Sequence, residues 1–144
     1  MIEPDTIRLL RECDAGIRMG VSAIDDVIGR VTDDRLSRRL TVCKNEHRQL
    51  SSELQTQLDR FGDGGKRPGA MASAMSSLKT NVKLTLHPGD STVADLMTDG
   101  CNMGVKSLSR YLNEYGAADE RAKDAAKKLI AIEENLTADL RRYL

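Results

Sequence analysis

The stretch LSRRLTVCKNEHRQLSSELQTQLDRF, residues 36–61, decides the fold class of this chain. Its apolar residues recur at alternating spacings of three and four, which is the pattern of a helix with one buried face. His47 interrupts that face near its middle. Thr32 or Asp33 is a suitable N-cap before the stretch, and Gly62 is a natural stop after it. The apolar positions are Leu36, Leu40, Cys43, Leu50, Leu54, Leu58 and Phe61.

The same period continues through the rest of the chain, where alternating β-branched residues are nearly absent. It predicts helices over about residues 5–29, 68–86, 90–115 and 119–143, with Asp90 or Ser91 as the N-cap of the fourth helix. The four longer helices would each be about 37 Å long. We therefore expect one all-α domain over residues 1–144, a four-helix bundle of two helical hairpins with helix 68–86 as a short crossover. One side of that crossover helix carries Met71, Met75, Leu78, Val82 and Leu86.

Charge and composition narrow the classes of partner. Lysine plus arginine and aspartate plus glutamate both number 22, and aromatic residues make up 3% of the chain. A net charge of zero argues against binding to duplex DNA or to an anionic membrane surface, and the shortage of aromatic rings argues against base stacking. No apolar run reaches about 18 residues, so a membrane span is not expected. We predict no nucleic-acid partner and no membrane partner.

The N-terminal sequence and the cysteines indicate a compartment. MIEPDTIRLL, residues 1–10, lacks the basic start and the apolar core of a secretory signal. Cys13, Cys43 and Cys101 are odd in number, widely spaced and without a CxxC motif. Such cysteines fit reduced, buried thiols. The expected location is the cytoplasm.

Two internal similarities predict that the chain is a repeated hairpin. AGIRMGVSAI, residues 15–24, and DGCNMGVKSL, residues 99–108, share the pattern G-x-x-M-G-V. Residues 45–58 align with residues 131–144 at a shift of 86, which matches His47 with Glu133. The alternative is a chance likeness between amphipathic helices. A true repeat would relate the two hairpins by a pseudo-two-fold axis.

Each copy of the shared pattern carries a pair of glycines on one helix face. The pairs are Gly16 with Gly20, and Gly100 with Gly104. Each pair costs roughly 2 kcal/mol of helix propensity relative to alanine, so it needs a compensating use. Close approach of two helix backbones is the usual use, which predicts that the first and fourth helices touch there. The alternative is that the glycines leave room for a ligand.

Three stretches carry a resemblance to a known group of proteins. They are EHRQLSSELQ at residues 46–55, the loop GDGG (62–65) followed by MASAMSSLK (71–79), and GCNMGVKSLSRYL at residues 100–112. In these stretches the chain resembles the uncharacterised bacterial ferritin-like four-helix-bundle proteins. The resemblance implies two hairpins joined by a long crossover. The chain departs from the metal-binding members of that class because it contains no E-x-x-H motif.

Polar residues interrupt the apolar stripes at matching heights. Asp14, His47 and Glu133 each replace an apolar residue, and Cys101 lies on a fourth stripe. In an up, down, down, up order the four positions fall within roughly 8 Å of one height. One hypothesis is a mononuclear Zn²⁺ or Fe²⁺ site made by these four side chains. The alternative is a buried, hydrogen-bonded pair of His47 and Glu133 that fixes the helix register.

The motifs do not favour an enzyme, because no P-loop, dinucleotide fingerprint or nucleophile–base arrangement occurs. We expect a non-enzymatic ferritin-like bundle with a degenerate metal site and no cofactor, acting as an interaction or structural protein. The first alternative is a metal-binding or redox protein that holds Zn or Fe at the mid-bundle cluster. The second is a protein with a small-molecule pocket made by the glycine pairs. A homodimer is expected through four apolar positions, Met19, Met103, Tyr111 and Tyr115.

Overall fold

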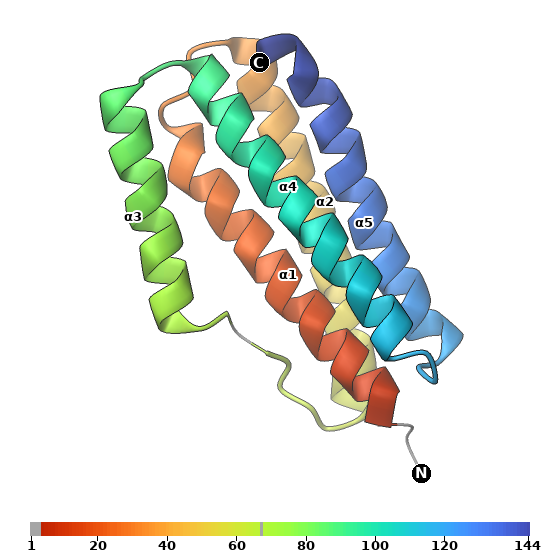
Figure 1. Ribbon diagram of the computed structural model, residues 1–144. Coiled ribbons are helices and arrows are strands. Elements are labelled where there is room, and N and C mark those ends of the chain that lie inside the picture. Colours follow the sequence, from red (N-terminus) through yellow and green to blue (C-terminus); the bar gives the residue numbers. More distant parts are fainter. Residues whose placement is uncertain (1–3, 67) are drawn as a thin grey trace.

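The computed structural model describes residues 4–66 and 68–144, without the side chains of residues 70–74 (Figure 1). This part of the chain is helical and contains no strand, which confirms the all-α prediction. None of its helices combines the length and the apolar character that a bilayer crossing requires. The elements are α1 (Pro4–Ile28), α2 (Asp34–Arg60), α3 (Ala70–Leu86), α4 (Asp90–Glu114), α5 (Glu120–Leu140) and the 3-10 helix η1 (Arg141–Tyr143).

The helices α1, α2, α4 and α5 form a bundle in which each helix runs antiparallel to its two neighbours (Figure 1). α1 packs against α2 and α4, and α5 packs against the same two helices. α1 with α2 and α4 with α5 are therefore two hairpins. α3 lies outside the bundle against α1 and α4, and it connects the hairpins. The expected helical bundle is confirmed at this level of detail.

A polar layer divides the apolar core into two clusters. On α2 one cluster ends at Leu50 and the other begins at Cys43, and the buried His47 lies between them. Glu133 occupies the corresponding place on α5 and is also buried. The middle of the bundle thus holds two titratable side chains at one level.

Asp33 and Asp119 begin the second helix of each hairpin in the same way. The Asp33 carboxylate accepts a hydrogen bond from the backbone N–H of Leu36 at 2.9 Å. The Asp119 carboxylate accepts one from the N–H of Ala122 at 2.8 Å. Both bonds satisfy an otherwise unpaired donor of the first helical turn. The first of them confirms Asp33 as the cap of α2.

The expectation that Asp90 or Ser91 caps α4 is wrong. Gly89 holds the N-cap position with φ 130°, a backbone conformation that favours glycine. Asp90 lies in the first turn, and its carboxylate accepts from the N–H and the hydroxyl of Thr32, both at 2.8 Å, and from the N–H of Asp33 at 2.9 Å. It therefore joins the turn after α1 to the start of α4.

The apolar side of α3 faces away from the bundle. Met75, Leu78, Val82 and Leu86 are 65%, 63%, 49% and 68% exposed, respectively. Leu84 is the buried residue among the described side chains of α3. Met71, which belongs to the same stripe, lies outside the described side chains. The described side chains of α3 that contact the bundle include Leu84, which joins a core cluster, and Ser77, whose hydroxyl donates to Asp26 at 2.9 Å.

Candidate functional site

A cavity of about 460 Å³ lies between α1 and α4 and extends to α3. Its volume falls within the range of roughly 300–1,000 Å³ that is common for small-molecule sites. His47 of α2 and Glu133 of α5 contribute to its lining. The exposed Met19 and Met103 line it as well, so the cavity reaches the surface. All four glycines of the sequence pattern line it, namely Gly16, Gly20, Gly100 and Gly104.

His47 is held with one ring nitrogen in use and the other without a partner. Its Nδ1 donates to the backbone carbonyl of Cys43 at 2.8 Å, so in the neutral ring Nε2 carries the lone pair. Nε2 is buried and has no hydrogen-bond partner among the described residues. Burial lowers the pKa of His47, which favours the neutral ring. The ring therefore offers an acceptor in the middle of the bundle.

Glu133 presents a buried carboxyl group at the same level. Its Oε2 has no hydrogen-bond partner among the described residues. Burial raises the pKa of Glu133 to about 8, so the group is mainly protonated at neutral pH. A protonated carboxyl group can both donate and accept a hydrogen bond.

Each polar side chain faces a glycine of the other helix in its hairpin. A Cβ added at Gly20 of α1 would lie 2.5 Å from His47 Nε2. A Cβ added at Gly104 of α4 would collide with the carboxyl group of Glu133. These two glycines therefore leave room for the polar layer.

The other two glycines have different surroundings. A Cβ at Gly16 would lie 3.3 Å from Leu129 Cδ2, and a Cβ at the exposed Gly100 would meet none of the described side chains within 4 Å. The predicted use of all four was close packing of the first helix on the fourth. Added Cβ atoms at Gly16, Gly20 and Gly104 would first meet side chains of α2 and α5, and α1 packs on α4 in the bundle. Close backbone approach at the glycines stays a prediction.

His47 and Glu133 are not hydrogen-bonded to each other. The ring uses Nδ1 for the Cys43 carbonyl, and its Nε2 and the Oε2 of Glu133 lack partners within the described part of the chain. The buried, hydrogen-bonded pair of His47 and Glu133, which was the alternative to a metal site, is therefore not formed in the structure. His47 Nε2 points toward Gly20 and Glu133 Oε2 points toward Gly104, and both glycines line the cavity.

Cys101 shares the cavity, whereas Asp14 lies elsewhere. Cys101 lines the cavity, and burial raises the pKa of its thiol to about 11. Asp14 is not among the lining residues; its Oδ2 accepts from the backbone N–H of Lys66 at 2.9 Å and from Arg18 Nε at 3.2 Å. The described residues bring no three His, Cys, Asp or Glu side chains within reach of one metal ion.

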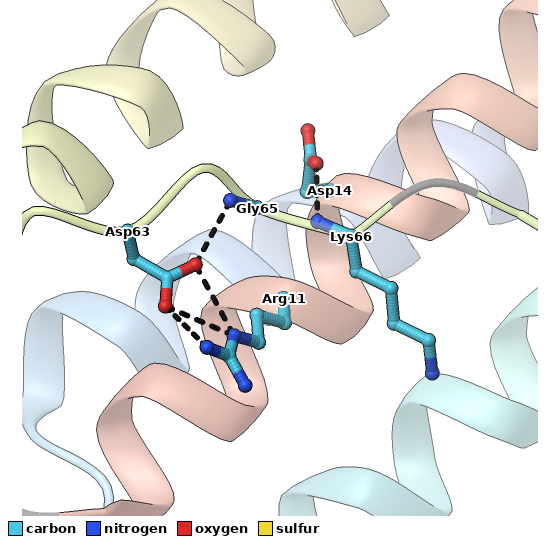
Figure 2. A network of polar contacts seen from close by, with 5 residues as sticks. All are labelled: Arg11, Asp14, Asp63, Gly65 and Lys66. Carbon is cyan, nitrogen blue, oxygen red and sulfur yellow. Dashed lines mark hydrogen bonds and ion pairs between the residues drawn. The ribbon is translucent and has the colours of Figure 1, made fainter.

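The loop after α2 is fastened to α1 by a small polar network (Figure 2). Asp63 accepts from Arg11 Nε at 3.0–3.1 Å and from the N–H of Gly65 at 2.8 Å. Lys66, three residues after Asp63, donates its backbone N–H to the carboxylate of Asp14. Lys66 lines the cavity, and so do the next described residues, 68 and 69. The network thus positions one edge of the cavity.

This role of Asp14 and the contribution of the loop were not among the features predicted from the sequence. Asp14 and Lys66 are 52 positions apart, and no local pattern links them. The loop GDGG does carry a signal, because Gly65 has φ 81° and its position leaves no room for a Cβ beside the Asp14 carboxylate. A buried carboxylate on a helix stripe followed later by a glycine-rich loop is compatible with such an anchor.

Comparisons with known proteins give a fold relationship. No family model matches the chain, and no curated protein matches it. A crystal structure of a DUF305 fragment from Deinococcus radiodurans is similar, with a TM-score of 0.76 and 11% identical residues. The likeness covers 98% of this chain and 95% of that one. At this identity it shows the helical fold alone.

Proposed function

We propose that this chain is a non-enzymatic helical-bundle protein that binds a small molecule in the cavity between α1, α3 and α4. The observation that carries the proposal is that His47 and Glu133 line this cavity and each has a buried polar atom without a partner. Buried polar groups are nearly always hydrogen-bonded, and an unsatisfied one costs about 1–3 kcal/mol. A ligand that contacts His47 and Glu133, which form the floor of the cavity, would provide both atoms with a hydrogen-bond partner.

Two of the glycines support a binding site. Gly20 and Gly104 each cost roughly 1 kcal/mol of helix propensity relative to alanine, and a Cβ at either position would collide with His47 Nε2 or with the Glu133 carboxyl group. A core that served stability alone would hold apolar side chains at this level, because a buried polar atom without a partner costs free energy. Two unpartnered polar groups kept on the lining of a cavity are a feature expected of a binding site.

Native mass spectrometry of the full chain, purified from cells without harsh washing, tests the proposal. We expect a bound small molecule that is released on denaturation. The variant His47→Leu should lose it, and His87→Leu should retain it, because His87 is exposed and does not line the cavity. Equal retention by both variants would show that the cavity floor does not bind the molecule.

Metal binding is the second candidate function. The Nδ1–H of His47 bonds to a backbone carbonyl, the arrangement by which metal-binding histidines present Nε2 to an ion. Glu133 and Cys101 line the same cavity, but no three such side chains of the described residues lie within reach of one ion. Zn²⁺ or Fe²⁺ would therefore need water or another ligand to complete its shell. Protein purified without chelator that contains well under one equivalent of metal and shows no thermal shift with either ion would exclude this role.

We also propose that the bundle is ferritin-like. The order of its hairpins and the crossover helix α3 support this relationship. Two correspondences at a shift of 86 support an internal repeat, the caps Asp33 and Asp119 and the polar residues His47 and Glu133. A solved structure whose two hairpins superpose on each other at these four residues would be the test.

We also propose that the chain forms a homodimer. Its support is the exposure of apolar side chains on one face, with Met103 71% exposed and Met19 39% exposed. Tyr111 of α4 and Tyr115, the residue that follows this helix, stack on each other with ring centroids 6.0 Å apart. Light scattering at high micromolar concentration should report twice the mass of one chain, and a monomer there would exclude this dimer.

A further inference from the structure

We infer that the cavity takes an uncharged, mainly apolar small molecule that donates one hydrogen bond to His47 and accepts one from Glu133. The inference rests on the binding role proposed above, and it adds the chemical class of the ligand. It stands on three features of the cavity, namely its walls, its floor and the charges at its edge.

The walls are largely apolar. α1 contributes Ile24, α4 contributes Leu96, Met97 and Leu108, and α5 contributes Leu136. Apolar walls favour a ligand that buries hydrocarbon surface, with roughly 25 cal/mol gained for each Å² removed from water. The methionines at the surface, Met19 and Met103, are flexible enough to adapt to different ligand shapes.

The floor provides one acceptor and one group that can donate. His47 Nε2 is the acceptor, because Nδ1 donates to the Cys43 carbonyl. The carboxyl group of Glu133 is surrounded by buried residues, which raises its pKa and keeps its proton at neutral pH. Rotation about the last torsion of Glu133, which is broad and roughly two-fold, turns either oxygen toward the cavity. A ligand hydroxyl or amide matches this pair of groups.

The charges that border the cavity already have partners. Lys66 Nζ bonds to Glu12 at 2.6 Å, and Asp26 accepts from the hydroxyl of Ser77 at 2.9 Å. An anionic ligand would therefore meet no unpaired cation among these groups, and a cationic ligand would meet only Asp26, whose partner is a neutral hydroxyl. An uncompensated buried ion costs several kcal/mol, which favours an uncharged ligand. Among the described residues, the titratable side chains that face the cavity are Glu12, Asp26, His47, Lys66, Cys101, Tyr111 and Glu133.

Four probes that share one ring test the inference on the full chain at pH 7. They are benzyl alcohol, toluene, benzylammonium and benzoate, and their affinities are measured by ligand-observed NMR. We expect benzyl alcohol to bind at least about tenfold more tightly than either ion, and about three- to tenfold more tightly than toluene, the ratio expected from one net hydrogen bond. His47→Leu should remove the advantage over toluene and leave toluene itself bound.

A matched pair of leucine substitutions on α4 locates the binding. Gly100 lines the cavity, so Gly100→Leu should weaken all probes that bind there. Asn102 is exposed and is not a lining residue, so Asn102→Leu should leave the affinities unchanged. Both changes place the same side chain on the same helix, which controls for a general effect of an added leucine.

The outcomes separate this inference from the proposed function. Tighter binding of benzylammonium or benzoate than of benzyl alcohol, lost in Gly100→Leu, would overturn the uncharged class and leave a binding cavity. Equal affinities for benzyl alcohol and toluene would show that the floor groups do not recognise the ligand, which overturns the inference too. Binding of no probe, or binding that Gly100→Leu does not affect, would overturn both.

Discussion

At the scale of single residues, the chemistry of this protein depends on two side chains in an otherwise apolar core. His47 and Glu133 are 2% and 7% exposed and have unpartnered outer atoms. Burial moves their pKa values in opposite directions, downward for the imidazole and upward for the carboxyl group, and both changes favour the neutral form. The polar layer is thus uncharged near pH 7.

The first prediction concerns pH. Glu133 has a pKa of about 8 when folded against an ordinary value of 4.5, so the folded state holds a proton that the unfolded state releases. Its stabilising effect is complete below pH 4.5 and is lost as pH rises to about 8. The slope is at most about 1.4 kcal/mol per pH unit, so the free energy of unfolding should fall by about 1–2 kcal/mol between pH 6.5 and 8. Urea unfolding at the two pH values measures it.

The variant Glu133→Gln is the control for that prediction. It keeps the shape without the titration, so its stability should be nearly constant over the same interval. The lowered pKa of His47 acts below pH 6.5, and the thiols of Cys43 and Cys101, with pKa values of about 12 and 11, act above pH 9. An equal decline in the variant would assign the effect to another group.

The second prediction compares two glycines. Gly100→Ala should stabilise the protein by about 1 kcal/mol, because the position is exposed, its Cβ would meet none of the described side chains within 4 Å, and alanine favours the helix. Gly20→Ala should destabilise it despite the same helix gain, because the new Cβ would lie 2.5 Å from His47 Nε2 and the ring must move. Thermal and urea unfolding of both variants give the comparison.

A second substitution checks the cause of the Gly20 effect. In a His47→Ala background the ring is gone, so Gly20→Ala should become neutral or stabilising, with a coupling of about 1 kcal/mol or more between the two sites. Additive effects of the two substitutions would mean that the alanine is rejected by something other than the ring.

At the scale of elements, the loop after α2 is the segment whose position the apolar pattern of the sequence did not predict. It is held by the buried acceptor Asp14, and by Asp63, which accepts from the N–H of Gly65 and pairs with the exposed Arg11 (Figure 2). These two anchors contribute differently to the stability of the folded chain. A buried carboxylate that accepts from a backbone N–H is costly to lose, whereas exposed ion pairs contribute about 0–1 kcal/mol.

The third prediction follows from that difference. Asp14→Ala should cost about 1–3 kcal/mol and should abolish the hydrogen-exchange protection of the Lys66 amide, because this amide bonds to Asp14. Arg11→Ala, which removes the exposed side of the pair with Asp63, should cost under about 1 kcal/mol and leave that protection largely intact. Hydrogen exchange followed by NMR distinguishes them. Loss of protection to the same extent in both variants would mean that the loop detaches as one unit.

The helix bounds could be predicted from the sequence because each helix carries a regular apolar stripe. The stripe of α2, for example, predicts both the helix and its buried face, and Asp33 predicts its start. The stripe of α3 predicts the helix but not the direction in which Leu78 and Val82 face. That direction depends on how α3 lies across α1 and α4, which only the folded chain determines.

At the scale of the whole molecule, the candidate site could be predicted in part. The positions of His47, Glu133 and Cys101 along the apolar stripes predicted that they lie at one level of the bundle, and all three line the cavity. The same pattern also predicted Asp14 at that level, but Asp14 bonds to a loop residue 52 positions away, a contact that periodicity cannot show. The cavity itself was only an alternative use of the glycines, because empty space depends on the packing of three helices.

A crystal structure of the full chain, as purified from cells, would show whether the cavity holds a ligand. We predict electron density for an organic molecule in the cavity, with atoms within hydrogen-bonding distance of His47 Nε2 and of the Glu133 carboxyl group. Ordered water alone on both groups, or a closed cavity in which His47 and Glu133 bond to each other, would contradict the account.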